Sequence, residues 1–327
     1  MTPLLEVKNL QVDFIQKQQK VRHAVLGVNF ILNKGETLGI VGETGCGKSA
    51  VAKAIVKLFP KHTTHLQGEV LFKEKNLLLA SEKELQSIRG QEIGMIFQDP
   101  MTSLNPTMNI GLQILEGYRR SHPHLSKKEA LLKITELLEW VGVQGAAERI
   151  HDYPHTLSGG MRQRVMIAIA LASNPKILIA DEPTTALDVT VQAQILSLFK
   201  SIQKKLGMST ILITHDLSVV AGSCDRVLVM YAGRVVESAL VEDLFYRPKH
   251  PYTKKLLEAA PKLHGRREES LIPIEGIPPD GSFISKGCSF YPRCKEALSL
   301  CKLTSPPLIQ IASKHHTECW LHAKDPL

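Results

Sequence analysis

The sequence contains no apolar run long enough to cross a membrane. A spanning helix needs about 20 consecutive apolar residues, whereas the closest run here, VMIAIALA at 165–172, is followed by Ser173, Asn174 and Pro175. The opening residues, MTPLLEVKNL, lack the basic and then apolar pattern of a secretory signal. Both absences predict a cytosolic chain, in which cysteines are thiols or metal ligands more often than disulfides.

Blocks of basic residues, internal repeats and low-complexity tracts are also absent. The 40 Lys and Arg residues exceed the 32 Asp and Glu residues and give a net charge of +8, but the excess is spread along the chain. Nucleic-acid binding usually needs basic residues gathered on one face, so we expect no nucleic-acid partner. Spread positive charge suits solubility and attraction to an anionic ligand or membrane surface.

The apolar pattern predicts an α/β fold. Hydrophobic residues make up 43% of 327 residues, enough for a large core without disulfide staples. Short β-branched runs alternate with segments of helical periodicity, as in α/β sheets. The expected strands lie at 4–15, within 25–42, and at 68–72, 93–97, 176–183, 209–216 and 225–238. The expected helices lie at 50–59, 127–143, 157–175 and 189–207.

Two parts of the chain depart from this alternation. From Asp99 to about Tyr153 the pattern is mostly helical, which predicts a helical insertion in the sheet. After about residue 250 prolines become frequent, and four of the six cysteines fall within 288–319. We therefore expect a small separate C-terminal element at 251–327.

The stretch GETGCGKSA at 42–50 connects an expected strand to an expected helix. The apolar run TLGIV precedes it, and AVAKAIVKLF follows with helical spacing. Glycines allow backbone N–H groups to curl around a phosphate, and the helix N-terminus adds partial positive charge. An ordinary glycine-rich turn is the alternative, but the strand and the helix lie on the correct sides for a phosphate-binding loop.

The residue types in this loop suit a nucleoside triphosphate. Lys48 is placed to reach the β- and γ-phosphates, and Ser49 to ligate Mg²⁺. The predicted nucleotide-binding residues of the loop are Gly42, Glu43, Thr44, Gly45, Cys46, Gly47, Lys48, Ser49 and Ala50.

Acidic and polar residues follow two other expected strands. In ILIADEP, Asp181 is placed to hold Mg²⁺ through water and Glu182 to polarise an attacking water. Such acids alone also serve as caps of the following helix. His215, in LITHD, lies at the end of another expected strand and is placed to contact the γ-phosphate, although a lone histidine is more often structural. With the loop, these residues predict a nucleoside triphosphatase.

The stretch LSGGMRQR at 157–164 identifies a family resemblance. Together with the loop, ILIADEP and His215, it resembles the ATP-binding cassette (ABC) ATPases, in matching order over about residues 4–250. The resemblance implies a P-loop NTPase (RecA-like) core, an antiparallel β subdomain and an inserted helical subdomain at about 99–165. The nucleotide-binding domain would span 1–250, with 251–327 as a small cysteine-containing extension.

The resemblance assigns further roles by position. Gln98, in IFQDP, matches the glutamine that links the γ-phosphate and Mg²⁺ to the transmembrane partner. Ser158, Gly159 and Gly160 match the signature, which binds ATP held by the opposite ATPase subunit. Asp188 matches the loop that crosses this dimer interface.

An adenine-stacking aromatic residue is expected near the start of the chain. Phe14 fits the family's position if QKQQKVRHA is an insertion, and His23 is the rival.

Longer stretches narrow the resemblance. IFQDPMTSLNP, LSGGMRQRVMIAIAL, HPYTKKLLEAAP and GCSFYPRC resemble the ATPase subunits of oligopeptide and dipeptide importers, whose relatives carry nickel. Such importers combine two transmembrane permeases, two ATPases that are usually non-identical, and an extracytoplasmic solute-binding protein. The resemblance implies ATP hydrolysis coupled to peptide import, at the cytoplasmic face of the cell (inner) membrane as a peripheral subunit.

The four late cysteines have unusual spacing. Cys288, Cys294, Cys301 and Cys319 match neither the zinc-ribbon nor the usual ferredoxin pattern. The matching subgroup tail is associated with a [4Fe–4S] cluster in some members, so a cluster is the first expectation, with Zn²⁺ and free thiols as alternatives. Three histidines also offer ligands: His315, His316 and His322.

Two other classes stay open at this point. ABC ATPases also act in DNA repair and translation without membrane partners, usually with two cassettes or a long coiled-coil insertion. A binding module without activity is the other, although Lys48, Asp181, Glu182 and His215 are all intact. The cargo, peptide or nickel, and the identity of the second ATPase, paralogue or second copy, are not fixed by these residues.

Overall fold

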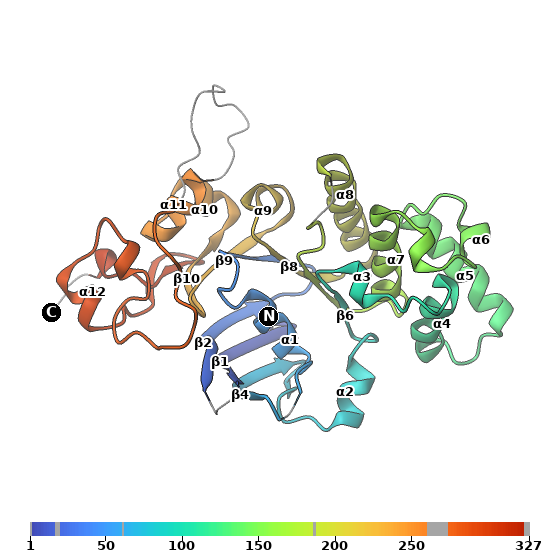
Figure 1. The fold of residues 1–327 in the computed structure, drawn as a ribbon, viewed down its shortest axis with the longest axis horizontal. Helices are drawn as coiled ribbons and strands as arrows, with labels where there is room; N and C mark the ends of the chain where they lie inside the picture. The colour runs from blue at the N-terminus through green and yellow to red at the C-terminus, as the bar shows by residue number, and fades with distance from the viewer. Residues whose placement is uncertain (1, 17–19, 61, 186–187, 260–273, 324–327) are drawn as a thin grey trace. The chain divides into compact units, whose positions relative to one another are not determined.

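The computed structural model describes the chain as two compact units (Figure 1). The described residues are 2–16, 20–60, 62–185, 188–259 and 274–323. Unit 1 comprises the described parts of 1–33, 37–79 and 213–327, and unit 2 comprises those of 34–36 and 80–212.

Unit 1 contains the expected antiparallel sheet. Its strands are β1 (Leu5–Ile15), β2 (Val21–Leu32), β4 (Thr64–Phe72) and β5 (Lys75–Asn76), in the order β2-β1-β4-β5. Leu5 pairs with Leu32 on one side and with Phe72 on the other, and all three are buried. Alternation of apolar and polar residues in β1 turns one face of the sheet to the core.

A second group of strands in unit 1 surrounds β3 (Thr37–Val41), which is buried along its whole length. β3 runs parallel to β9 (Arg226–Tyr231). A two-residue turn at Ala232 and Gly233, both with positive φ, connects β9 to β10 (Arg234–Leu240), as this hairpin geometry requires.

The end of the chain adds two strands beside β10. β12 (His315–Thr317) pairs with β10, and β11 (Ile309–Ala312) pairs with β12. These strands are not predicted from the sequence, because both are too short to show a clear period. Residues after 250 thus complete a sheet that starts in the first part of the chain.

Helices and short turns fill the rest of unit 1. They are α1 (Lys48–Ile55), α9 (Leu217–Ser223), α10 (Val241–Tyr246), α11 (Pro251–Glu258), α12 (Ser299–Leu303), η3 (Tyr291–Arg293) and η4 (Trp320–His322). Helix α1 begins two residues earlier and ends four residues earlier than expected. It stops because Lys57 adopts a left-handed conformation, at φ 52°, ahead of Pro60.

Three buried rings join the extension to the rest of unit 1. Tyr231 of β9, Tyr252 of α11 and Phe290 are each at most 1% exposed. Their ring centroids lie 4.7–5.4 Å apart in tilted and edge-on arrangements, which favour aromatic contact. This aromatic cluster fixes the extension against β9, the strand that pairs with β3.

Unit 2 combines strands with the expected helical insertion. Its strands follow the order β8-β7-β6, with β6 (Ile93–Ile96), β7 (Ile177–Asp181) and β8 (Ser209–Thr214), of which residues 209–212 belong to this unit. Its helices are α2 (Glu82–Ile88), α3 (Pro100–Ser103), α4 (Ile110–Ser121), α5 (Lys127–Trp140), α6 (Ala146–Arg149), η2 (Pro154–Thr156), α7 (Gly159–Leu171) and α8 (Val189–Leu206).

The helical insertion has a core of its own. Ile114 of α4, Ile134 of α5 and Ile167 of α7 are fully buried, and these three helices pack together. Ser126 starts α5 with a capping box in which its side chain and Glu129 satisfy each other's backbone N–H groups.

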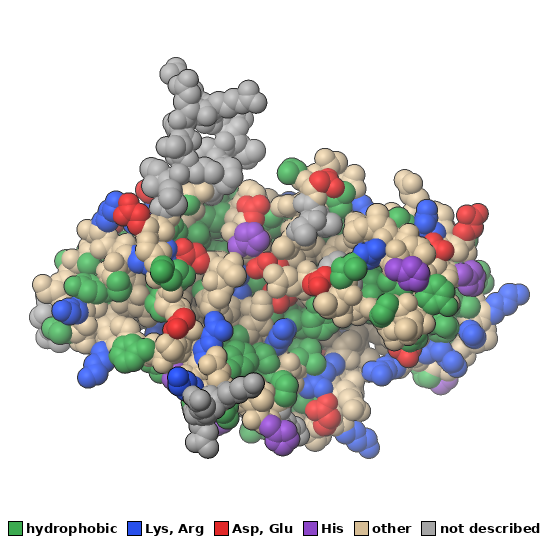
Figure 2. All heavy atoms as spheres, in the orientation of Figure 1, with side chains coloured by type: hydrophobic (Ala, Val, Ile, Leu, Met, Phe, Trp, Pro, Cys, Tyr) green, Lys and Arg blue, Asp and Glu red, His purple; other side chains and the backbone are tan. Residues whose placement is uncertain are grey.

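No helix within the described ranges is long and apolar enough to span a bilayer. On the face drawn in Figure 2, Lys and Arg side chains are interspersed with acidic ones.

The turn from β3 to α1 leaves no room for a side chain at two positions. A Cβ on Gly42 would lie 2.2 Å from the Met230 carbonyl oxygen, and a Cβ on Gly47 would lie 2.3 Å from that of Ala24. Gly47 also has φ 106°, a conformation that glycine adopts easily and other residues rarely do. The neighbouring strand backbones therefore determine the path of the loop.

We expect Gly47→Ala to destabilise the protein more than Gly45→Ala. Gly45 also has a positive φ, but an added Cβ there meets nothing within 4 Å, so only backbone strain of about 1–2 kcal/mol applies. Gly47→Ala adds a clash with the Ala24 carbonyl that requires backbone movement. Guanidinium unfolding measures both free energies, and equal losses would contradict the packing explanation.

A second prediction concerns His250, a buried histidine that caps α11. Its Nδ1 accepts a hydrogen bond from the Tyr252 backbone N–H at 3.0 Å. Burial lowers the pKa of His250 from its ordinary value of 6.5 to about 3. Between these values the unfolded chain binds more protons than the folded chain. The stability from the neutral ring is therefore present above pH 6.5 and is lost as the pH falls towards 3.

We expect His250→Asn, which retains a capping acceptor, to flatten the pH dependence of the free energy of unfolding below pH 6.5. The wild-type slope should exceed that of the variant by at most about 1.4 kcal/mol per pH unit. Denaturant titrations at several pH values between 5 and 7.5 measure this difference, and identical slopes would show that His250 carries no such linkage.

Candidate functional site

Lys48 lies at the start of α1 with its ammonium group over the loop. The residue is 4% exposed, and its Nζ donates hydrogen bonds to the carbonyl oxygens of Gly42 (2.7 Å) and Glu43 (3.0 Å). Ser49 follows on the first turn of the helix. A buried ammonium group beside a helix N-terminus is suited to binding an anionic group such as a phosphate.

Neighbouring strands and helices hold the loop through its backbone. The Gly233 N–H donates to the Cys46 carbonyl oxygen at 3.0 Å, and the Glu43 N–H donates to the Tyr252 hydroxyl at 2.9 Å. Burial raises the pKa of the Cys46 thiol, although nearby Lys48 opposes the shift. Cys46 therefore remains a neutral small side chain within the loop.

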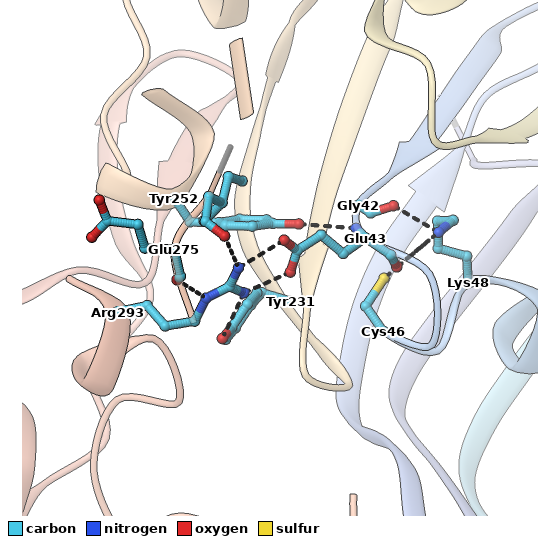
Figure 3. Close-up of polar contacts among 9 residues, drawn as sticks. Gly42, Glu43, Cys46, Lys48, Tyr231, Tyr252, Glu275 and Arg293 are labelled. Atoms are coloured by element: carbon cyan, nitrogen blue, oxygen red, sulfur yellow. Dashed lines mark hydrogen bonds and ion pairs between the residues drawn. The ribbon is translucent and has the colours of Figure 1, made fainter. Parts of the chain in front are cut away.

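The structure also shows a loop partner that the sequence did not predict. Arg293, in η3 of the extension, forms an ion pair with Glu43, the second residue of the loop (Figure 3). The two residues are 250 positions apart, so no local pattern indicates the contact. The stretch YPRC contributes only to the family resemblance.

His215 and the two adenine-stacking candidates also lie in unit 1. His215 follows β8 directly and is exposed. Phe14 packs edge-on against Phe59, with ring centroids 5.3 Å apart. His23 instead lines a cavity that also contains Gly45 of the loop, and its Nδ1 lies 2.7 Å from Asp13 Oδ1.

Asp181 ends a fully buried strand of unit 2, and Glu182 follows it directly. Asp181 is the last residue of β7, whose five residues are all buried, and is itself 2% exposed. Glu182 is 8% exposed and has φ 47°. A left-handed conformation is strained for a residue with a long side chain, and such strain is concentrated at functional sites.

The structure brings Gln98 and Glu182 together. Gln98 Nε2 donates to Glu182 Oε2 at 3.0 Å, and the Thr185 hydroxyl donates to the same oxygen at 3.0 Å. The contact arises because β6 and β7 are parallel neighbours, paired from Ile93 with Ile177 onward. Residues that follow parallel strands emerge at the same edge of a sheet, where ligands usually bind.

The signature residues begin a helix. Ser158 is the N-cap of α7, and its hydroxyl accepts the Met161 N–H at 3.3 Å. Ser158 and Gly159 are exposed, while Gly160 is partly buried. The first turn of α7 therefore presents backbone donors to solvent, as an anion site requires.

Asp188 lies beside this helix start. It is the N-cap of α8, where its carboxylate accepts the Val191 N–H at 2.9 Å. A Cβ on Gly160 would lie 3.2 Å from Val191 Cγ1, so the first turns of α7 and α8 are in contact. The signature and the predicted interface loop thus form one surface of unit 2.

The four late cysteines line a single cavity of the extension. Cys288, Cys294, Cys301 and Cys319 surround it together with aromatic residues that include Phe290. Burial raises the pKa of Cys288, of Cys294 and, to about 12, of Cys319, which opposes the deprotonation that metal binding needs.

Within the described residues, no group of three or more His, Cys, Asp and Glu side chains is arranged to hold a metal ion. The residues that the structure describes therefore do not confirm the expected [4Fe–4S] cluster or its Zn²⁺ alternative. His315, one of the histidines that could supply a ligand, instead contacts Glu237: its Nε2 lies 2.8 Å from the buried carboxylate.

Comparison with known proteins gives two family matches. The ABC transporter family matches residues 25–185, and the family "Oligopeptide/dipeptide transporter, C-terminal region" matches residues 236–301. The first range contains the loop, Gln98, the signature and Asp181, and the second contains Arg293 and three of the four late cysteines.

Curated relatives align over nearly the whole chain. The oligopeptide transport ATP-binding protein OppD of Bacillus subtilis (strain 168) is 52% identical over 98% of this chain and 89% of its own. The dipeptide transport ATP-binding protein DppD of the same organism is 50% identical over 98% and 95%.

Solved structures agree with these relatives. A dimeric, post-hydrolysis structure of the ATP-binding cassette MJ0796 bound to ADP and Pi has a TM-score of 0.65 and 28% identity, over 72% of this chain and 98% of that one. The cbiO1 protein of Clostridium perfringens, part of the ABC transporter complex cbiONQ, has a TM-score of 0.62 and 29% identity, over 76% and 92%.

The expected fold class, a P-loop NTPase core with an antiparallel sheet and a helical insertion, is confirmed by these structures. Since relatives about half identical in sequence align with almost every part of it, the chain belongs to the ABC transporter family of ATP-binding proteins.

Proposed function

We propose that this chain is the ATP-hydrolysing subunit of an importer that takes dipeptides or oligopeptides across the cytoplasmic membrane. Full-length similarity to oligopeptide and dipeptide transport ATP-binding proteins supports it, as does the matching C-terminal region at 236–301. The observation that carries the chemistry is the Glu182 carboxylate, buried after β7 and oriented by Gln98.

The ligands of this family are ATP and Mg²⁺, and the proposed roles follow from the donor types present. Lys48 binds the β- and γ-phosphates through its ammonium group, while the backbone N–H groups of the glycine loop donate hydrogen bonds to the phosphate oxygens. Ser49, Gln98 and Asp181 offer the oxygen ligands that Mg²⁺ prefers. When held by these residues, Mg²⁺ would supply positive charge that offsets the charge of the phosphates.

Glu182 is the proposed general base. Its carboxylate, 8% exposed and fixed by hydrogen bonds from Gln98 and Thr185, is held in one orientation toward the carboxyl edge of β7. A carboxylate fixed in this way orients and polarises an attacking water without reorganising. His215 is proposed to stabilise charge at the γ-phosphate, because a neutral imidazole offers one N–H donor.

The signature surface is proposed to bind a nucleotide held by a second ATPase subunit. Ser158, Gly159 and Gly160 present the N-terminus of a 13-residue helix, a suitable site for an anionic phosphate. Asp188, which caps the adjacent α8, is then part of the interface with that subunit. We propose that the second subunit is a paralogue, so that the two form a heterodimer.

His23 is the better-placed candidate for the adenine ring. It lines the cavity beside Gly45, whereas Phe14 is in contact with Phe59. Base stacking on an imidazole ring is sequence-tolerant and suits a nucleotide pocket.

Importers of this family work with membrane permeases. We propose two permease subunits, an extracytoplasmic solute-binding protein that acts indirectly, and a peripheral position on the cytoplasmic face of the membrane. We also propose that 1–250 acts as the nucleotide-binding domain, with the signature in a helical subdomain at about 99–165, and 251–327 as its extension.

Nickel or another small solute is the alternative cargo. A soluble ABC ATPase of DNA repair or translation is the alternative of another class, and co-purification with membrane permeases distinguishes it from an importer.

We expect Glu182→Gln to retain ATP binding but to lower ATP turnover by a factor of about 100–10,000, because a neutral amide is a poor base. A strain that lacks the native chain would be complemented with wild type or variant. Uptake of a labelled dipeptide and of Ni²⁺ is then measured in each strain.

Glu92→Gln is the matched control, since Glu92 precedes β6 at the opposite end of the same strand pair and bonds Lys176. Wild type and control should import the dipeptide, and Glu182→Gln should not. Unchanged turnover in Glu182→Gln would remove Glu182 from the mechanism, and uptake of Ni²⁺ alone would replace the proposed cargo.

The iron–sulfur cluster at the four late cysteines is a separate proposal. Its support is the meeting of all four thiols at one cavity and the preference of iron–sulfur clusters for four thiolates. A bound cation would stabilise the thiolates that burial otherwise disfavours.

We expect protein purified without oxygen to contain about four iron and four acid-labile sulfide per chain. Cys294→Ser should lower both, whereas Cys224→Ser, which alters a cysteine outside the cavity, should not. About one zinc per chain would favour the alternative ion, and absence of all three would leave the cysteines as thiols.

A further inference from the structure

The Arg293–Glu43 ion pair joins the extension to the phosphate-binding loop. Arg293 Nη1 lies 2.7 Å from Glu43 Oε2, and Nη2 lies 2.9 Å from Oε1, so the guanidinium and carboxylate meet as two parallel hydrogen bonds (Figure 3). The Arg293 side chain is 4% exposed and that of Glu43 is 22% exposed. Bidentate pairs of this kind are stronger and more specific than surface ion pairs.

The guanidinium of Arg293 is itself held in place. Its Nε donates to the Glu275 carbonyl oxygen at 2.9 Å, and Nη2 donates to that of Ile274 at 3.1 Å. Nη1 also donates to the Tyr231 hydroxyl at 3.3 Å, and the group lies 5.7 Å from the centre of that ring. Arg293 therefore brings a fixed charge to the loop.

The loop carries a negative charge, on Glu43, which would repel its proposed ligand, ATP. Glu43 is the second residue of the phosphate-binding loop, and a bare carboxylate there would repel the phosphates of ATP. The paired guanidinium neutralises that charge. It also turns the carboxylate toward the extension, on the side of Glu43 away from Lys48, as Figure 3 shows.

The same residue contacts the phosphate-binding lysine through its backbone. The Glu43 carbonyl oxygen accepts from Lys48 Nζ at 3.0 Å, and the Glu43 N–H donates to the Tyr252 hydroxyl at 2.9 Å. Glu43 is thus held by Arg293 through its side chain and by Tyr252 through its backbone. A shift of Glu43 would move an acceptor of the Lys48 ammonium group.

We propose that Arg293 is a positioning residue for ATP binding, which neutralises Glu43 and fixes the loop segment that faces Lys48. The inference rests on the proposed function, in that the loop binds ATP. It assigns to the C-terminal extension a direct part in nucleotide affinity.

The test uses the full chain in its transporter complex and a fluorescent, non-cleavable ATP analogue. Arg293→Gln should weaken the affinity by about tenfold or more, because Glu43 is left unpaired beside the phosphates. The same variant should raise KM for ATP with kcat much less changed, as expected when binding rather than transition-state stabilisation is lost.

The double variant Arg293→Gln/Glu43→Gln separates charge neutralisation from simple structural support. Removal of the carboxylate should restore the affinity to within about threefold of wild type, since no charge then needs neutralising. The defect of Arg293→Gln should also shrink in high salt, which screens repulsion. Arg293→Lys, which keeps the charge without the fork, should bind better than Arg293→Gln.

Lys254→Gln is the matched control. It removes a cation from another ion pair of the extension, with Glu296 at 3.3 Å, that does not involve the loop. Its affinity for the analogue should equal that of wild type.

Equal losses in the single and the double variant, with no dependence on salt, would overturn the inference and leave Arg293 a purely structural residue. If Arg293→Gln does not fold, the comparison of Arg293→Lys with Arg293→Lys/Glu43→Gln decides the matter in the same way. Failure of the wild-type complex to bind the analogue would instead contradict the proposed function.

Discussion

The close approach of backbone to backbone around the phosphate-binding loop is the constraint on which the rest of unit 1 depends. Carbonyl groups of Ala24 in β2 and Met230 in β9 leave space for a hydrogen, but not for a methyl group, at Gly47 and Gly42. The antiparallel sheet and the β3–β9 strands therefore meet at the loop, and each fixes part of its path. Helix α1 then carries Lys48 to a defined place over that loop.

In unit 2, the direction of the strands brings the candidate catalytic residues together. Because β6 and β7 are parallel, the residues after them emerge at one edge, and Gln98 meets Glu182 there. The left-handed backbone at Glu182 turns its carboxylate into this position at the expense of local strain. The same unit presents the start of α7 and Asp188 as a second surface. Unit 2 therefore carries both the candidate base, Glu182, and a candidate anion site at Ser158.

Local signals account for the parts that could be predicted from the sequence. The glycine spacing of the loop, the acids after β7 and the serine before α7 each lie within a few residues of the element that they begin or end. Their meaning does not depend on distant contacts. The end of α1 was less predictable, because left-handed Lys57 interrupts a run that otherwise continues with helical spacing.

Contacts between distant segments were not predictable in this way. Nothing near Arg293 in the sequence indicates that it pairs with Glu43, and strands as short as β11 and β12 leave no periodic signal. The spacing of the late cysteines was compatible with several ligands. The folded arrangement places all four at one cavity, although no metal-binding group is formed among the residues that the structure describes. The geometry of that cavity depends on Phe290 and the rings around it, which no spacing rule describes.

The long separation between Glu43 and Arg293 has a consequence for the order of events during synthesis. A ribosome makes the loop early and Arg293 250 residues later, so the nascent cassette emerges with its carboxylate still facing water. The loop acquires its final electrostatic character only when almost the whole chain has left the exit tunnel. If Arg293 has the proposed role, an incomplete chain would bind nucleotide more weakly than the finished protein does.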